Sequence, residues 1–250
     1  MVDPMPTEAE QHLIEVEKLN DEAKFQEAFR KTFITEKKQG AELGDLWTLH
    51  DMQIPMGMPA KLIRIQDPSH QDFRISEVAD RLKFVQPTPV VILSGAMTPK
   101  SGKTMAGVAR AAYNTGSLMI DSGMGSDVEK FAMRRGIKLL GVCPEAQVTF
   151  PKISNRQPNE LTNGHTHFFL IGNEDRSIKF NWGDESRLKF ELASRIGKGR
   201  VQGMGASGSP ACKQVTVVIG DNEEQAIRDI EASMNMKVPV VVVRGTPMTD

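Results

Sequence analysis

The chain of 250 residues is long enough for one large domain, and its 39% hydrophobic content is ordinary for a globular protein. Lys and Arg total 31 against 32 for Asp and Glu, so no net field draws the chain to nucleic acid or to an anionic membrane, and neither partner is expected. Two cysteines without metal or disulfide spacing, no signal-like N-terminus and no apolar run near the roughly 20 residues that span a bilayer favour a cytoplasmic location without membrane insertion.

The N-terminal stretch predicts a helical arm. Thr7 and Glu10 have the spacing of a capping box, and an apolar face follows at Leu13, Val16, Phe25, Phe29 and Phe33. This face either packs on its own domain or docks a partner, as in a homo-oligomer or a parent channel. Glycine and proline breaks across residues 37–59 predict a connector with a short helix or turn near residues 46–50. We therefore place the arm and connector at residues 1–58 and the main domain at residues 59–250.

From residue 59 onward, strand and helix patterns alternate. Polar and apolar residues alternate at 61–65, which predicts an edge strand, and residues 75–84 predict a covering helix. Buried strands are expected at 90–93, 118–120, 137–142, 168–171, 215–219 and 238–243. The last helical pattern puts Ala226, Ile227, Ile230 and Met234 on one apolar face. About seven strands with crossover helices predict an α/β, Rossmann-like, doubly wound and mostly parallel sheet flanked by helices.

Four stretches carry a resemblance to a known family: residues 111–123, 136–142, 161–173 and 183–196. There the chain resembles the SLOG domain in the N-terminal cytosolic region of melastatin-type transient receptor potential channels, over roughly residues 59–250. The wider superfamily holds DprA-type proteins and the lysine-decarboxylase-like phosphoribohydrolases. The resemblance implies a Rossmann-like fold and a nucleotide-type ligand, with ADP-ribose or a relative as the expected small molecule and no certain cofactor.

The candidate ligand-binding residues lie in the turns after the strands, because ligands of such sheets bind outside the carboxyl ends of the strands. These residues are Ser94, Gly95 and Ala96; Ser122, Gly123, Met124, Gly125 and Ser126; Gly220, Asp221 and Asn222; and Gly245 and Thr246. The resemblance adds Arg176 and Arg187 from a segment that the family places near its pocket, and arginine suits forked contacts with phosphate. No catalytic residue and no metal ligand is predicted.

Two acids depart from the family pattern. Asp127 replaces the third glycine of the turn after residues 118–120, and Asp221 replaces a glycine of the turn after residues 215–219. Glycine turns let backbone amides approach a phosphate, so carboxylates there should weaken its binding. The alternative is that the acids only cap helix N-termini.

Several residues have a structural reading beside the functional one. Ser101 to Thr104 resemble the end of a P-loop, but Met97 stands where its first glycine is needed. His165 and His167 are expected to hydrogen-bond within their loop rather than to share a metal. Cys143 is expected in the core, and Trp182 either stacks on a base or packs.

Three functions stay open. The first is a cytosolic nucleotide-sensing or regulatory domain that resembles the SLOG domain of the ion channels and binds an ADP-ribose-like nucleotide. The second is a non-enzymatic scaffold with a degenerate pocket. The third, a nucleoside-monophosphate phosphoribohydrolase, is disfavoured because the family's catalytic Glu aligns with Ile227. The sequence leans towards a protein that is not an enzyme.

Overall fold

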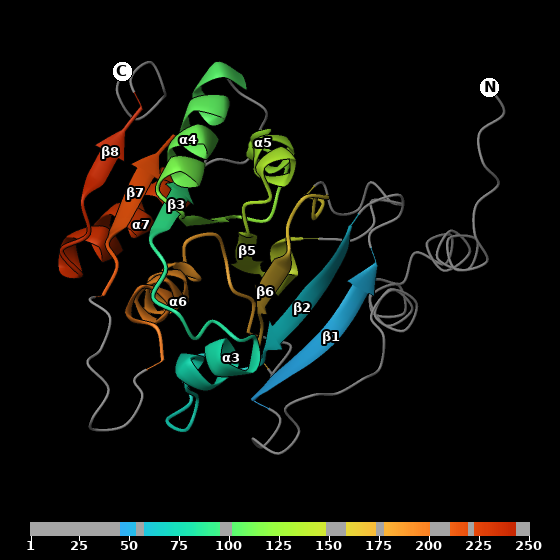
Figure 1. The fold of residues 1–250 in the computed structure, drawn as a ribbon. Coiled ribbons are helices and arrows are strands. Elements are labelled where there is room, and N and C mark those ends of the chain that lie inside the picture. Colours follow the sequence, from blue (N-terminus) through green and yellow to red (C-terminus); the bar gives the residue numbers. More distant parts are fainter. Residues whose placement is uncertain are drawn as a thin grey trace, which may run out of the picture.

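The computed structural model describes residues 46–53, 58–95, 102–148, 159–173, 178–200, 211–219 and 223–243. Within these ranges eight strands form one sheet in the order β1-β2-β6-β5-β4-β3-β7-β8, flanked by helices α3 to α7 (Figure 1). All neighbouring pairs are parallel except β1 and β2. The predicted α/β doubly wound fold is confirmed, while the predicted arm at residues 7–33 lies outside the described ranges. No helix in these ranges is long and apolar enough to cross a membrane.

The strands and helices follow the sequence patterns closely from residue 59 onward. The strands are β1 (Trp47–Gln53), β2 (Pro59–Ile65), β3 (Val90–Ser94), β4 (Leu118–Asp121), β5 (Leu139–Pro144), β6 (His167–Ile171), β7 (Gln214–Val218) and β8 (Val240–Val242). The helices are α3 (Ile75–Arg81), α4 (Gly102–Asn114), α5 (Val128–Arg135), α6 (Ser186–Lys198) and α7 (Glu223–Asn235), with a short 3-10 helix η2 (Glu145–Gln147).

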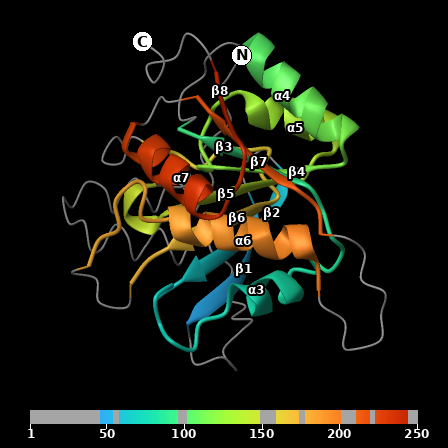
Figure 2. The same cartoon turned by 90° about the vertical axis from the view of Figure 1, so that its left-hand side faces the viewer.

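Helices cover both faces of the sheet. Figure 2 shows α4 and α5 on one side and α3, α6 and α7 on the other. Strand β3 serves both layers, because Val91 and Leu93 pack towards α4 while Val90 and Ile92 pack towards α6. A strand buried on both faces needs an unbroken apolar run, which is why residues 90–93 carry no polar side chain.

The N-terminal edge of the sheet differs from the prediction. Residues 47–53 form strand β1 rather than a short helix or turn, and they pair antiparallel with β2 along its whole length. Strand β2 is therefore not an edge strand, since β6 pairs with its other side. The sequence concealed β1 because the buried positions include the polar Thr48 and His50, whose side chains bond to each other at 2.8 Å.

Helix α7 also differs from the prediction. Ile227 and Met234 were expected on its buried face, but they are 42% and 71% exposed. The buried residues of α7 are mostly polar: Gln225, Ala226, Asp229 and Ser233. This is possible because α6 and β7 supply hydrogen-bonding partners for that polar row.

Candidate functional site

The sheet changes its winding direction between β3 and β7. From β3 the chain passes through α4 to β4 on one face, and later returns through α6 on the other face to pair β7 with the free side of β3. The carboxyl ends of β3 and β7 lie side by side, because the Ile219 N–H donates to the Ser94 carbonyl oxygen at 2.9 Å. Open α/β sheets bind ligands outside such strand ends, so the fold marks this edge as the candidate site.

The turn after β3 presents a buried hydroxyl. Ser94 is fully buried, and its Oγ has no hydrogen-bond partner within the described part of the chain. Gly95 follows with a φ of 69°, in the left-handed region that glycine adopts readily. The backbone therefore turns sharply at the strand end, and the Ser94 hydroxyl is left available for a further hydrogen bond.

The turn after β4 is held closed by its own polar groups. Asp121 accepts a hydrogen bond from the Gly123 N–H at 2.8 Å, and the Gly123 carbonyl accepts one from the Thr162 N–H at 3.1 Å. Gly123 has a φ of 79°, and a Cβ there would meet the Phe168 ring at 3.3 Å. Glycine at this position thus satisfies both the backbone conformation and the close packing against β6.

A buried ion pair lies beneath this turn. The Asp121 Oδ1 and the His165 Nε2 are 2.8 Å apart, with both side chains fully buried. Burial by itself favours the neutral imidazole, but the charge and hydrogen bond of Asp121 outweigh it and raise the pKa of His165. Burial also raises the pKa of Glu129, and the Asp121 charge adds to this effect. Three titratable side chains, Asp121, Glu129 and His165, thus influence one another beneath this turn.

Four buried oxygens at these turns have no hydrogen-bond partner in the described ranges: Ser94 Oγ, Asp121 Oδ2, Ser126 Oγ and Glu129 Oε2. Buried polar atoms in folded proteins nearly always have partners, so such a group calls for an explanation. Ionised carboxylates only accept hydrogen bonds, whereas hydroxyls both donate and accept. The set suits a ligand that carries hydroxyl groups, as a ribose does. In the described residues no group of three His, Cys, Asp or Glu could hold a metal ion.

A second buried polar network joins α6 to α7. The Lys189 Nζ lies 2.8 Å from the Asp229 Oδ2, and the Ser186 hydroxyl donates to the Asp229 Oδ1 at 2.6 Å. Burial disfavours the charged amine, yet the carboxylates of Asp229 and Glu185 outweigh it and raise the pKa of Lys189. Glu185 accepts the Gly183 N–H at 2.7 Å, and burial raises its pKa. These bonds explain how α7 buries a polar face, and we assign them a structural role.

The structure brings together only some of the predicted site residues. Ser94 and Gly95 end β3, and the residues of the β4 turn are buried or half-buried beside them: Ser122, Gly123, Met124, Gly125 and Ser126. Arg187 instead lies on α6, where it pairs with Glu191 and lines a groove facing α7. The remaining predicted residues lie outside the described ranges: Ala96, Arg176, Gly220, Asp221, Asn222, Gly245 and Thr246.

The structure gives packing or hydrogen-bonding contacts to the side chains for which the sequence allows both a structural and a functional role. His165 bonds within its loop to the Thr162 carbonyl at 2.9 Å, as predicted, and the His167 ring packs against Phe84. Cys143 is fully buried, and burial raises the pKa of its thiol, as befits a core residue. Trp182 is partly buried and packs against the cluster that contains Cys143.

Asp127 is the N-cap residue of α5 and has a φ of 69°. Its carboxylate does not bond to the backbone of the helix, but pairs with the Lys130 Nζ at 2.6 Å. Its charge is thus partly balanced, which reduces the repulsion that the sequence alone predicts.

Sequence reasoning missed the buried acids and their partners. Glu129 is on the first turn of α5, where an acid reads as an ordinary helix-capping charge, and His165 is far from Asp121 along the chain. For the second network, between α6 and α7, the sequence does carry a signal: the polar residues Gln225, Asp229 and Ser233 recur every four residues in α7.

The comparisons with known proteins agree with this architecture. The model of the family described as SLOG in TRPM, prokaryote, matches residues 76–250, from α3 to the last residue. No curated protein matches the chain. The matched range contains all the candidate turns and begins after β1 and β2.

Proposed function

Because the chain belongs to the SLOG family through its match over residues 76–250, we propose that it is a cytosolic sensing or regulatory module that binds an ADP-ribose-like nucleotide. The family and the Rossmann-like fold support a nucleotide-related role. The choice of ligand rests on the chemistry of the strand ends.

One observation carries this proposal: buried oxygens without partners gather at the carboxyl ends of two adjacent strands. Ser94 is the last residue of β3 and Asp121 the last residue of β4, while Ser126 lies in the turn after β4. An ADP-ribose-like molecule offers ribose hydroxyls to a carboxylate and phosphate oxygens to serine hydroxyls and helix N-termini. Such a molecule therefore offers a hydrogen-bond partner to each of these oxygens.

The phosphoribohydrolase alternative needs a carboxylate at the position of Ile227. Ile227 lies on α7 and is 42% exposed, apart from the buried acids after β4. The scaffold alternative depends on residues 7–33, which the described ranges do not include. A nucleotide sensor is therefore the function that the candidate site supports best.

Thermal unfolding of the full chain with ADP-ribose, ADP and AMP tests this proposal. At a ligand concentration one hundred times the dissociation constant, binding should add about 2.7 kcal/mol to the free energy of unfolding. If none of these nucleotides changes the unfolding temperature, the proposal is wrong.

Two serine variants test the location of the site. Ser94→Ala and Ser126→Ala remove hydroxyls that have no partner, so the unliganded protein should keep its stability. Each should weaken ADP-ribose binding by about two- to ten-fold, since each loses one hydrogen bond to the ligand. Ser69→Ala, in the exposed connection between β2 and α3, is the matched control and should bind normally. Unchanged binding in both site variants would put the nucleotide elsewhere.

A further inference from the structure

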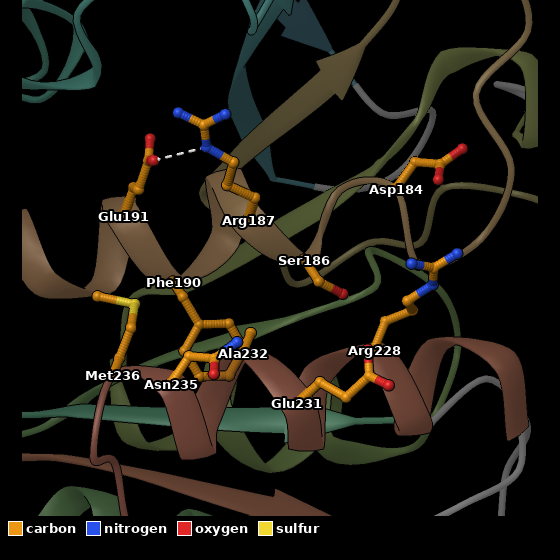
Figure 3. A pocket seen from close by; sticks show the side chains of 11 residues that line it. Asp184, Ser186, Arg187, Phe190, Glu191, Arg228, Glu231, Ala232, Asn235 and Met236 are labelled. Atoms are coloured by element: carbon orange, nitrogen blue, oxygen red, sulfur yellow. Dashed lines mark hydrogen bonds and ion pairs between the residues drawn. The ribbon is translucent and has the colours of Figure 1, made fainter.

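A groove lies between α6 and α7 on the helix layer. It encloses about 380 Å³, which falls within the range of small-molecule sites, about 300–1,000 Å³. Its lining comes from the turn before α6 and from facing sides of the two helices (Figure 3). None of its lining residues belongs to the turns after β3 or β4, so the groove is separate from the proposed nucleotide site.

The groove has an apolar middle and a charged end. Figure 3 shows Phe190 between the two helices, with Met236 towards one end and Arg228 towards the other. Ala232 lies beside Phe190 on the α7 side. Phe190 is fully buried and backs the groove, so its accessible apolar surface comes from Ala232 and Met236. A ligand in this groove would thus lay an apolar group on Ala232 and Met236 and present its polar group towards Arg228.

Two opposite charges in the groove have no partner among the residues that the structure describes. Arg187 is bonded to Glu191 through its Nε at 2.9 Å, and this is the interaction drawn in Figure 3. Arg228 and Glu231 lie three residues apart on α7, and neither forms a hydrogen bond or ion pair with any described residue. The groove therefore offers one cationic and one anionic group that a ligand could engage.

Gly183 leaves room for the stem of Arg228. Gly183 has a φ of 97°, and a Cβ there would lie only 2.6 Å from the Arg228 Cγ. The stem of Arg228 therefore rests directly against the turn before α6. The N-cap residue of α6 is Glu185, whose carboxylate already accepts the Gly183 N–H, so the anionic group of a ligand would depend on Arg228. The nearby Asp184 carboxylate already accepts the Asn181 N–H at 2.8 Å.

We propose that this groove binds a zwitterionic apolar amino acid. Its carboxylate would pair with Arg228, its ammonium with Glu231, and its side chain would lie on Ala232 and point towards Met236. A simple anion would meet the Glu231 charge and a simple cation would meet the Arg228 charge, so a ligand that carries both charges fits best. Residues three apart on a helix have Cβ atoms about 5–6 Å apart, close enough for the adjoining charged groups of one amino acid to reach both side chains.

Three probes with a similar apolar body test this inference on the full chain. They are L-phenylalanine, 3-phenylpropanoate, which lacks the ammonium, and 2-phenylethylamine, which lacks the carboxylate. We expect L-phenylalanine to shift amide resonances of α6 and α7 in a saturable way, and each analogue to bind about ten-fold more weakly. No saturable binding of L-phenylalanine, or shifts confined to the turns after β3 and β4, would overturn the proposal.

Charge-removing variants assign the two contacts. Arg228→Gln should weaken L-phenylalanine about ten-fold and leave 2-phenylethylamine unchanged, while Glu231→Gln should weaken L-phenylalanine and leave 3-phenylpropanoate unchanged. Arg110→Gln, which removes an exposed arginine from α4, is the matched control and should bind all three probes normally. If Arg228→Gln binds L-phenylalanine as tightly as the original protein, the assignment is wrong. This outcome is independent of ADP-ribose binding, because the two sites share no residue.

Discussion

Substitution of Gly141 should expose how tightly the turn after β4 is packed on the sheet. A Cβ on Gly141 would lie 2.5 Å from the Gly123 Cα, 2.9 Å from the Phe168 Cδ1 and 3.1 Å from the Gly123 nitrogen. The first and last of these neighbours are backbone atoms, held by the bonds that Gly123 makes with Asp121 and Thr162. The turn cannot move away without breaking those bonds.

We therefore expect Gly141→Ala to lower the free energy of unfolding by about 1–3 kcal/mol, the usual cost of overpacking. For a chain of this length that corresponds to a melting temperature lower by roughly 2–12 °C. Urea titration monitored by circular dichroism measures the free energy of unfolding, and thermal unfolding measures the melting temperature.

Gly107→Ala is the control for this experiment. Gly107 lies in the interior of α4 with nothing within 4 Å of an added Cβ, so alanine there should raise stability by roughly 0.5–1 kcal/mol. If Gly141→Ala unfolds at the same urea concentration as the original protein, the turn after β4 is looser than its contacts indicate and the packing argument fails.

Three further predictions follow from buried or cap charges. Lys189→Met should cost about 3–5 kcal/mol of stability by leaving the buried Asp229 carboxylate without a countercharge, and adding Asp229→Asn should restore part of it in denaturant titrations. The free energy of unfolding should fall as the pH drops from 6.5 to about 4. Burial lowers the pKa of His167 to about 4, so over this range only the unfolded chain gains the proton. His167→Gln should flatten this part of the curve of stability against pH. Asp127→Gly with Asp221→Gly should tighten ADP-ribose binding in calorimetric titrations, and less so at high salt; an unchanged affinity would contradict the charge argument.

The order of strands and helices was predictable because local patterns determine most of it. The apolar run at residues 90–93, the glycine turn after it and the apolar spacing of α4 each point to the same unit. Strand β1 was missed because its burial depends on pairing with β2 and not on its own alternation of residues. The polar face of α7 was missed because it depends on Lys189, a residue of another helix.

The candidate site was predictable as a set of turns, but not as a set of contacts. Glycines at residues 95 and 123 occur where the backbone needs a positive φ, a requirement that sequence alone can express. The contact between Asp121 and His165 joins the end of β4 to the loop before β6, and Gly141 on β5 leaves room for the turn that follows Asp121. Such a contact joins segments distant in sequence, and no local pattern encodes it.

The position of β3 between β4 and β7 has a consequence for how the chain folds as it is synthesised. β3 can pair with β4 soon after both leave the ribosome, but its other edge is covered only by residues 214–218, which are synthesised much later. Until then, the fully buried Ile92 and Leu93 lie in a strand with one row of unpaired backbone groups, which is a template for pairing with other chains. Chains that terminate before β7 should therefore aggregate rather than remain as partly folded monomers, and the nascent protein should depend on chaperones until β7 has emerged.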